Sequence, residues 1–164
     1  MVPSTGSYDR VVLLQCNIDD MTGEQLGFAL ERILEQGALD VWFAPIYMKK
    51  NRPAVVFSVL CRAGKGPKFR DLLLRETSTL GVRWQVMERE IAQRRIERVD
   101  IPWGTVGCKV KILCGRVVSA KPEFQECAEL AREYDVPLRC VMEAAERAIG
   151  ERMGEWSSED GGER

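Results

Sequence analysis

The sequence predicts an α+β fold, because short runs of strand-forming residues alternate with helical segments through the first half of the chain. Residues 11–14 (V-V-L-L) suit a buried strand, and residues 22–36 place apolar side chains at the three-and-four spacing of one helix face. Two strands, a helix and a further strand follow by residue 88. This order of elements is that of a ferredoxin-like split βαβ sandwich, in which an antiparallel sheet carries both helices on one face.

Local signals define the first helix and the hairpin after it. Thr22 and Gln25 have the spacing of a capping box at a helix start. Residues 40–48 and 54–62 are rich in strand formers and are separated by a turn-forming run, so they predict a hairpin. Pro45 cannot donate a backbone hydrogen bond, which favours either an edge position for the strand that contains it or a β-bulge.

The second helix and the fourth strand complete the sandwich over residues 10–88. Pro67 stands where a first helical residue belongs, and the T-S-T-L-G run at 77–81 ends the helix. A fourth strand is expected over 82–88. We expect residues 1–9 to be a flexible N-terminus.

The second half of the chain predicts an extension of the same unit over residues 89–153. Strands at 90–101 and 105–113, joined by a Pro-Trp-Gly turn, predict a β-hairpin. A helical pair follows, with one helix over 121–134 and another beginning at Pro137. The Ser-, Glu- and Gly-rich end, 154–164, predicts a disordered tail.

The predicted topology brings three connections to one edge of the sheet. A right-handed crossover after the first strand sets the directions of the others. The acidic turn 17–22, the basic hairpin turn 49–52 and the turn 75–79 then meet. We therefore expect opposite charges and hydroxyl groups to gather at this edge.

The chemistry expected at that edge is binding of a divalent cation together with a polyphosphate. Asp19 and Asp20 offer oxygen ligands for Mg²⁺ or Mn²⁺, and basic side chains can neutralise phosphate oxygens. The alternatives are that Asp20 or Thr22 caps the helix and that both charged turns are merely solvated. A rival phosphate loop is the Gly-Lys-Gly-Pro-Lys run at 64–68, which lacks a complete P-loop pattern.

Composition excludes several classes of function. The 164 residues include 24 basic and 25 acidic side chains, so a net charge of −1 gives no global attraction to nucleic acid or membranes. No apolar run approaches the length of a membrane span, and the start lacks a signal-peptide pattern, so a cytoplasmic protein is expected. Histidine is absent, which excludes His-based catalysis and His metal ligands within this chain. The six cysteines have no C-x-x-C spacing and predict reduced core thiols.

Five segments in order resemble one family. They are C-N-I-D-D-M-T-G-E (16–24), A-L-D-V-W-F-A-P-I-Y-M-K-K-N-R-P-A (38–54), R-E-T-S-T-L-G-V-R (75–83), W-G-T-V-G-C-K-V-K (103–111) and K-P-E-F-Q-E-C (121–127). Together they resemble the C-terminal domain of the LarC-type nickel insertion proteins of lactate racemase maturation. The resemblance implies insertion of Ni²⁺ into pyridinium-3,5-bisthiocarboxylic acid mononucleotide to form the nickel-pincer cofactor, a chelatase or cyclometallase reaction of the lyase class. It further implies a requirement for CTP and Mg²⁺ or Mn²⁺, with release of CMP and pyrophosphate.

The resemblance and the residue types together give a set of candidate site residues. Candidate ligands of the divalent ion are Asp19, Asp20, Glu24 and Glu123. Candidate nucleotide-binding residues are Lys49, Lys50, Arg52, Arg75, Thr77, Thr79 and Lys121. No individual catalytic residue is indicated. Cys16, beside the acidic turn, is the thiol that could handle nickel or sulfur, with a buried strand cysteine as the alternative.

Partners and competing functions follow from the same observations. Complete members of the family carry an additional N-terminal domain, which this chain is too short to contain, so that domain is an expected partner. Edge strands and the extended hairpin favour a homo-oligomer. The competing class is a non-catalytic ligand-binding or assembly module, because fold does not fix function. RNA binding through the sheet is disfavoured by the near-neutral charge, and no membrane partner is expected.

Overall fold

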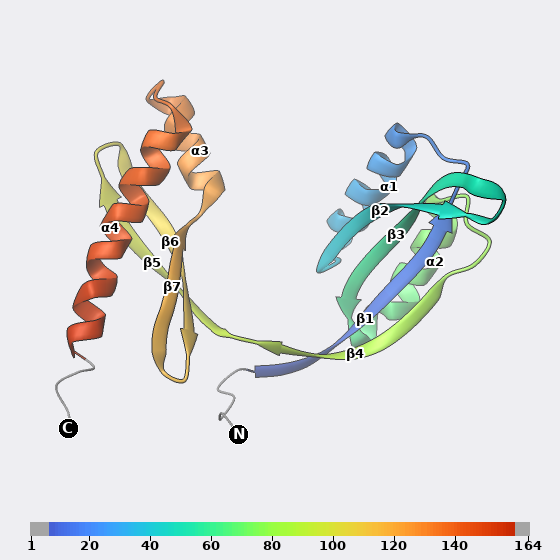
Figure 1. The fold of residues 1–164 in the computed structure, drawn as a ribbon, viewed down its shortest axis with the longest axis horizontal. Helices are drawn as coiled ribbons and strands as arrows, with labels where there is room; N and C mark the ends of the chain where they lie inside the picture. The colour runs from blue at the N-terminus through green and yellow to red at the C-terminus, as the bar shows by residue number, and fades with distance from the viewer. Residues whose placement is uncertain (1–6, 160–164) are drawn as a thin grey trace. The chain divides into compact units, whose positions relative to one another are not determined.

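The chain forms two compact units, the first over Tyr8–Arg89 and the second beginning at Glu90. The structure is a computed structural model and describes residues 7–159 (Figure 1). We expected residues 89–153 to extend the first unit, whereas they belong to a unit with a core of its own. Among the described residues, no helix is both long and apolar enough to span a membrane.

The first unit has the predicted α+β class and element order. Its four strands lie in the order β2-β3-β1-β4, and β3 pairs antiparallel with both β1 and β2. Pro45 therefore lies in an edge strand, as predicted. The elements are β1 (Ser7–Ile18), α1 (Gly23–Glu35), β2 (Asp40–Met48), the 3₁₀ turn η1 (Lys49–Asn51), β3 (Arg52–Arg62), the 3₁₀ turn η2 (Ala63–Lys65), α2 (Gly66–Glu76) and β4 (Arg83–Ile91).

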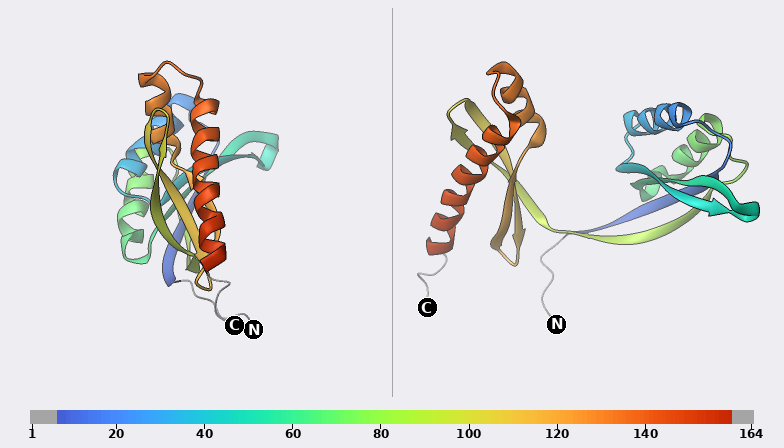
Figure 2. Two further views of the ribbon diagram at one scale, coloured as in Figure 1. Left: turned by 90° about the vertical axis from the view of Figure 1, so that its left-hand side faces the viewer. Right: turned by 45° about the horizontal axis from the view of Figure 1, so that its top comes forward.

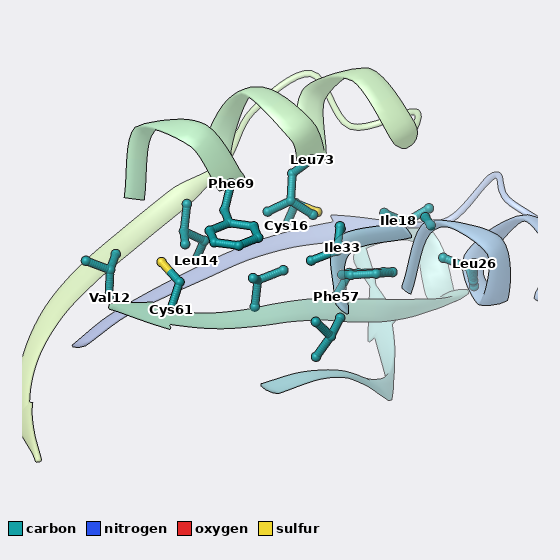
Figure 3. Close-up of a cluster of buried hydrophobic side chains, with 13 residues drawn as sticks. Val12, Leu14, Cys16, Ile18, Leu26, Ile33, Phe57, Cys61, Phe69 and Leu73 are labelled. Atoms are coloured by element: carbon teal, nitrogen blue, oxygen red, sulfur yellow. The ribbon is translucent and has the colours of Figure 1, made fainter. Parts of the chain in front are cut away.

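Both helices of the first unit lie on the same side of its sheet (Figure 2, right). The two helices cover a hydrophobic core. Alternate residues of β1 point into this core, from Val12 through Cys16 to Ile18. Phe57 of β3 and Phe69 of α2 are almost completely buried there (Figure 3). Full burial of one such side chain contributes about 1.5–3 kcal/mol, so this packing holds β1 and α2 in fixed positions.

The second unit is a three-stranded antiparallel sheet in the order β5-β6-β7, packed against two helices. The predicted hairpin is confirmed as the β5–β6 pair. Core side chains come mainly from β6 and α4, among them Val106, Val110 and Val141. The elements are β5 (Gln93–Ile101), β6 (Gly104–Leu113), β7 (Arg116–Pro122), α3 (Phe124–Glu133) and α4 (Leu138–Glu159).

Strand β7 is the main error of the prediction for this unit. Lys121 and Pro122 end β7 instead of beginning a helix, and α3 starts only at Phe124. The preceding turn has positive φ at both Cys114 and Gly115, at 51° and 75°, as in the tight turns that join hairpin strands. A Cys-Gly pair is a weak sequence signal for such a turn, so the third strand was missed.

The ends of the described chain are more regular than expected. β1 begins at Ser7, so the flexible N-terminus predicted for 1–9 is wrong over residues 7–9. α4 continues to Glu159, so the disordered tail predicted for 154–164 is wrong over residues 154–159. The remaining parts of both predictions lie outside the described residues.

A glycine joins α3 to the sheet of the second unit. The backbone N–H of Gly107 donates to Oε2 of Glu126 at 2.8 Å, and Arg98 Nη2 donates to the same oxygen at 3.3 Å. The backbone N–H of Glu123 in turn donates to the carbonyl of Gly107 at 2.8 Å. A Cβ atom at position 107 would lie 3.1 Å from Oε1 of Glu126, so a larger residue would make the Glu126 carboxylate shift by a few tenths of an ångström.

We predict that Gly107→Ala lowers the free energy of unfolding of the second unit by about 1–2 kcal/mol, because Glu126 must move away from two donors. The matched control is Gly150→Ala in α4, where no atom lies within 4 Å of the new Cβ. Alanine there should instead stabilise the helix by about 0.5–1 kcal/mol. Hydrogen exchange of β5–β7 amides during urea unfolding measures this unit separately. Equal shifts for the two variants would contradict the proposed contact.

Candidate functional site

The acidic turn follows β1 directly and leads into α1. Thr22 caps the helix, since its Oγ1 accepts from the backbone N–H of Gln25 at 3.3 Å. The Gln25 side chain accepts from the backbone N–H of Thr22 at 2.9 Å, which completes the predicted capping box. The capping alternative is therefore confirmed for Thr22 and wrong for Asp20. Neither Asp19 nor Asp20 is needed to begin the helix.

Asp19 joins the acidic turn to the basic hairpin, as the predicted topology requires. Arg52 Nη1 lies 3.0 Å from Oδ2 of Asp19. The Arg52 side chain is 60% exposed and that of Asp19 is 25% exposed, so the pair contributes at most about 1 kcal/mol to stability. The pair is informative about position more than about stability, because it shows that the first residue of β3 lies beside the end of β1.

The hairpin turn itself has an unusual backbone. Lys50 and Asn51 have φ values of 63° and 55°, in the left-handed region that non-glycine residues adopt infrequently. Lys49 and Lys50 are both exposed. No ion pair to either lysine is present among the side chains that the structure describes. Their charges are therefore available at the edge where Asp19 and Arg52 meet.

The third connection reaches the same edge through Ser78. Its hydroxyl donates to Oδ1 of Asp20, and its backbone N–H donates to the sulfur of Met21 at 3.4 Å. The predicted meeting of three connections is thus observed at the end of the sheet where β1 leads into α1 (Figure 1).

A cleft of about 540 Å³ lies between the start of α1 and the end of α2. Four predicted site residues line it, namely Asp20, Glu24, Arg75 and Thr77. The sequence analysis did not select the other five as site residues, namely Met21, Gln25, Phe28, Glu76 and Ser78. Glu76 and Ser78 are next to Thr77 in the sequence, and Phe28 follows Glu24 by one helical turn. Their positions beside predicted residues could therefore have identified them as further lining residues. Asp19, Lys49, Lys50 and Arg52 are not among the lining residues.

The acidic side chains of the cleft do not form a preassembled metal centre. Within residues 7–159, no group of three or more Cys, Asp or Glu side chains is arranged to hold a metal ion. Mg²⁺ commonly keeps several waters and binds one or two carboxylates together with substrate phosphates. Asp20 and Glu24 fit that mode, in which the nucleotide supplies the remaining oxygen ligands.

The two predicted threonines are already bonded to the backbone. Thr77 Oγ1 donates to the carbonyl of Leu73 at 2.7 Å, which helps to end α2. Thr79 Oγ1 donates to the carbonyl of Gly81 at 2.9 Å. A nucleotide-binding role for either hydroxyl stays a prediction, and it would require a change of hydrogen-bond partner.

Cys16 lies beneath this edge and faces the core. It is 1% exposed, and burial raises the pKa of its thiol despite hydrogen bonds with Thr79 and Thr77 that lower it. The structure therefore favours the buried strand cysteine over a thiol open to nickel or sulfur chemistry.

Lys121 and Glu123 lie in the second unit. Lys121 is in β7, and Glu123 precedes α3, where its Oε1 lies 2.9 Å from Nζ of Lys109. The remaining predicted residues all belong to the first unit. The structure thus assigns the candidate residues to two separate groups.

Comparison with known proteins gives the family. The model of the nickel insertion protein family matches residues 2–142, which is most of the 164-residue chain. The chain belongs to the nickel insertion protein family. This membership confirms the resemblance found in the sequence motifs.

Relatives within the nickel insertion family are substantially longer. A relative from Maridesulfovibrio salexigens is 48% identical over 126 residues, which cover 77% of this chain and 30% of the relative. The pyridinium-3,5-bisthiocarboxylic acid mononucleotide nickel insertion protein of Thermotoga petrophila is 38% identical over 149 residues, which cover 91% of this chain and 38% of that protein. The chain therefore spans about a third of the length of these relatives.

A solved structure of similar size matches nearly end to end. It is described as LarC2, the C-terminal domain of a cyclometallase involved in the synthesis of the NPN cofactor of lactate racemase, in the apo form. The TM-score is 0.83 at 40% sequence identity, and the match covers 88% of this chain and 99% of that one. The chain thus corresponds to one domain of the longer family members.

We predict that Cys114 reacts first with a thiol-specific disulfide reagent at pH 8, because it is exposed in the β6–β7 turn. Burial raises the pKa of the Cys16 and Cys61 thiols and, with acidic neighbours, that of Cys127. It raises the pKa of Cys108 to about 11. These four thiols should react only on unfolding, since the thiolate is the nucleophile. The measurement is the release of the reagent's chromophore over time. Cys114→Ser should remove the fast phase of chromophore release. Loss of the fast phase in Cys16→Ser would instead show that Cys16 is accessible and would contradict the prediction.

Proposed function

We propose that this chain is the nucleotide- and divalent-metal-binding part of a protein that inserts nickel into pyridinium-3,5-bisthiocarboxylic acid mononucleotide in a CTP-dependent reaction. Family membership supports this, since relatives carry that substrate in their names. The single observation that carries the proposal is the Asp19–Arg52 bridge. It places a carboxylate of the acidic turn beside an arginine of the basic hairpin, at the edge of the sheet where Ser78 also bonds to Asp20.

The proposed roles follow from charge and position. Asp20 and Glu24 would hold Mg²⁺ or Mn²⁺ in the cleft. Asp19 lies outside the cleft lining and would become available as a further carboxylate if Arg52 moved to a phosphate. Lys49, Lys50 and Arg52 neutralise the triphosphate, because charge-assisted contacts to phosphate are stronger than neutral hydrogen bonds. Arg75, Thr77 and Thr79 complete the pocket from the end of α2. Lys121 and Glu123, which belong to the second unit, stay candidate nucleotide- and metal-binding residues of that unit.

The proposed reaction uses CTP as an energy source and Ni²⁺ as a substrate. Water cleaves CTP between the α- and β-phosphates, which gives CMP and pyrophosphate. Lys49 and Lys50 would offset the charge that develops on the leaving pyrophosphate, and a divalent ion held by Asp20 and Glu24 would supply further positive charge. Nickel and the pyridinium substrate are handled with the remaining domain of the longer protein. That domain is therefore a proposed partner of this chain.

Two features of assembly belong to this proposal. The strand order β2-β3-β1-β4, with both helices on one side, supports the ferredoxin-like description of the first unit. β2 is an edge strand, so the edge of the sheet that it forms can pair with a strand of another copy of the chain, which supports a homo-oligomer.

A second candidate function is a non-catalytic ligand-binding module. The observation that favours it is that Asp19, Thr77 and Thr79 already have partners within the protein. Such a module binds CTP but does not convert it. Release of pyrophosphate from CTP by the isolated chain distinguishes the two functions.

We predict that CTP with Mn²⁺ raises the melting temperature of this chain more than ATP with Mn²⁺ does, because a ligand bound only by the native state stabilises it by mass action. At a ligand concentration of 100 times Kd the stabilisation is about 2.7 kcal/mol. The measurement is a thermal melt with each of the four nucleotides and with Mn²⁺ alone as control. Equal shifts for all four would contradict a cytosine-selective site.

We predict that Asp20→Asn weakens MnCTP binding at least tenfold while the melting temperature of the ligand-free protein stays nearly constant. Asparagine keeps the shape and can still accept from Ser78, but it loses the anionic oxygen that the metal requires. The control is Asp71→Asn on α2, whose carboxylate pairs with Arg70 outside the cleft. The measurement is a calorimetric MnCTP titration beside a thermal melt. Parent-like binding by Asp20→Asn would make this carboxylate structural.

A further inference from the structure

The open face of the second sheet carries four basic residues in direct register. Arg94 of β5 is paired with Lys111 of β6, and Lys109 of β6 is paired with Lys121 of β7. Lys109 and Lys111 are two residues apart, so they share the face opposite to buried Cys108 and Val110. Like charges at directly opposite positions of a sheet destabilise it.

The charges on this face are compensated only in part. Glu123 pairs with Lys109 at 2.9 Å. Among the side chains that the structure describes, no carboxylate forms an ion pair with Arg94, Lys111 or Lys121. Three positive charges therefore remain on a small part of the surface. These charged side chains are not part of the core, which lies on the other face of β6.

The same basic residues line a hollow in the surface. A cleft of about 290 Å³ is bounded by Arg94, Lys109, Lys111 and Lys121, with the hydroxyl-bearing Ser119 on β7. Ile91 and Ala92 border it with apolar surface. The volume is close to the lower end of the range of small-molecule pockets, roughly 300 Å³. We name this hollow the basic cleft.

We infer that the basic cleft binds the oligophosphate group of a small molecule. A diphosphate or triphosphate carries several negative charges on neighbouring oxygens, and three unpaired cations at neighbouring strand positions can contact them together. Ser119 can donate a further hydrogen bond, and the apolar border can contact a ring attached to the phosphates. The inference goes beyond the proposed function, which assigns the triphosphate of CTP to Lys49, Lys50 and Arg52 of the first unit, and makes the basic cleft a second oligophosphate site.

The test is calorimetric titration of the chain with inorganic tripolyphosphate in metal-free buffer at low salt. The parent should bind, and added salt should weaken binding because the contacts are between exposed charges. Lys111→Gln and Lys121→Gln should each raise Kd about tenfold to a hundredfold, as expected for loss of one charge-assisted contact. The matched control is Arg116→Gln, which removes an exposed charge from β7 outside the basic cleft. Thermal melts show that each variant is folded.

Further titrations identify the source of the phosphate. Repeating the titrations with pyrophosphate, CTP and CMP distinguishes a triphosphate site from a pyrophosphate or monophosphate site. Binding of pyrophosphate or CTP by the parent, with loss of that binding in Lys111→Gln, supports the inference. Binding of CMP alone overturns it. If the variants bind an RNA oligonucleotide less well than the parent but the parent does not bind tripolyphosphate, the face is a nucleic-acid surface and the inference is wrong.

Failure of this inference can be told from failure of the proposed function. A parent that does not bind tripolyphosphate, or equal Kd values for Lys111→Gln, Lys121→Gln and Arg116→Gln, overturns the inference whatever the result with CTP and nickel. Absence of MnCTP binding and turnover, with tripolyphosphate bound as expected, overturns the proposed function and leaves the basic cleft as a phosphate site.

Discussion

The candidate site of the first unit depends on the register between β1 and β3. The two strands pair from Val11 opposite Arg62 to Ile18 opposite Val55, and the pairing ends where the acidic turn begins. Asp19 therefore leaves the sheet close to Arg52, the first residue of β3. A slip of one residue would turn every second side chain of β1 to the other face. Burial of Cys16 and Ile18 beneath the helices prevents that slip, so core packing positions the charged edge.

The same core positions the third connection. Phe69 and Leu73 fix α2 on the sheet, and Thr77 ends the helix by donating to the carbonyl of Leu73. Ser78 then follows at the edge and bonds to Asp20. The meeting of the three turns is thus a consequence of apolar packing several residues away. This explains why hydrophobic spacing in the sequence was enough to predict which charged segments would meet.

Predictions from sequence failed where local chemistry carried little information. The third strand of the second sheet depends on a Cys-Gly turn with positive φ at both residues, and cysteine is not a residue that usually indicates such a turn. The division into two units was not predictable either. β4 runs to Ile91 and β5 begins at Gln93, so no Gly- or Pro-rich linker separates the units in the sequence. Site residues such as Ser78 and Glu76 were missed because their roles depend on side-chain direction at a helix end.

The two groups of candidate residues differ in how their charges are balanced. At the first edge Asp19 is neutralised by Arg52, and exposed pairs of this kind contribute at most about 1 kcal/mol, so a divalent ion can displace the arginine at little cost. Such a displacement would move one positive charge from the carboxylate to a phosphate, which couples metal binding to nucleotide binding in the proposed function. The basic cleft has three cations without a carboxylate partner among the described side chains, so an anion can bind there without first displacing a carboxylate. Although the net charge of the chain is −1, its two candidate surfaces differ: opposite charges are paired at the first edge, whereas the basic cleft has an excess of positive charge. The residues of the basic cleft are brought together by the cross-strand register of β5, β6 and β7.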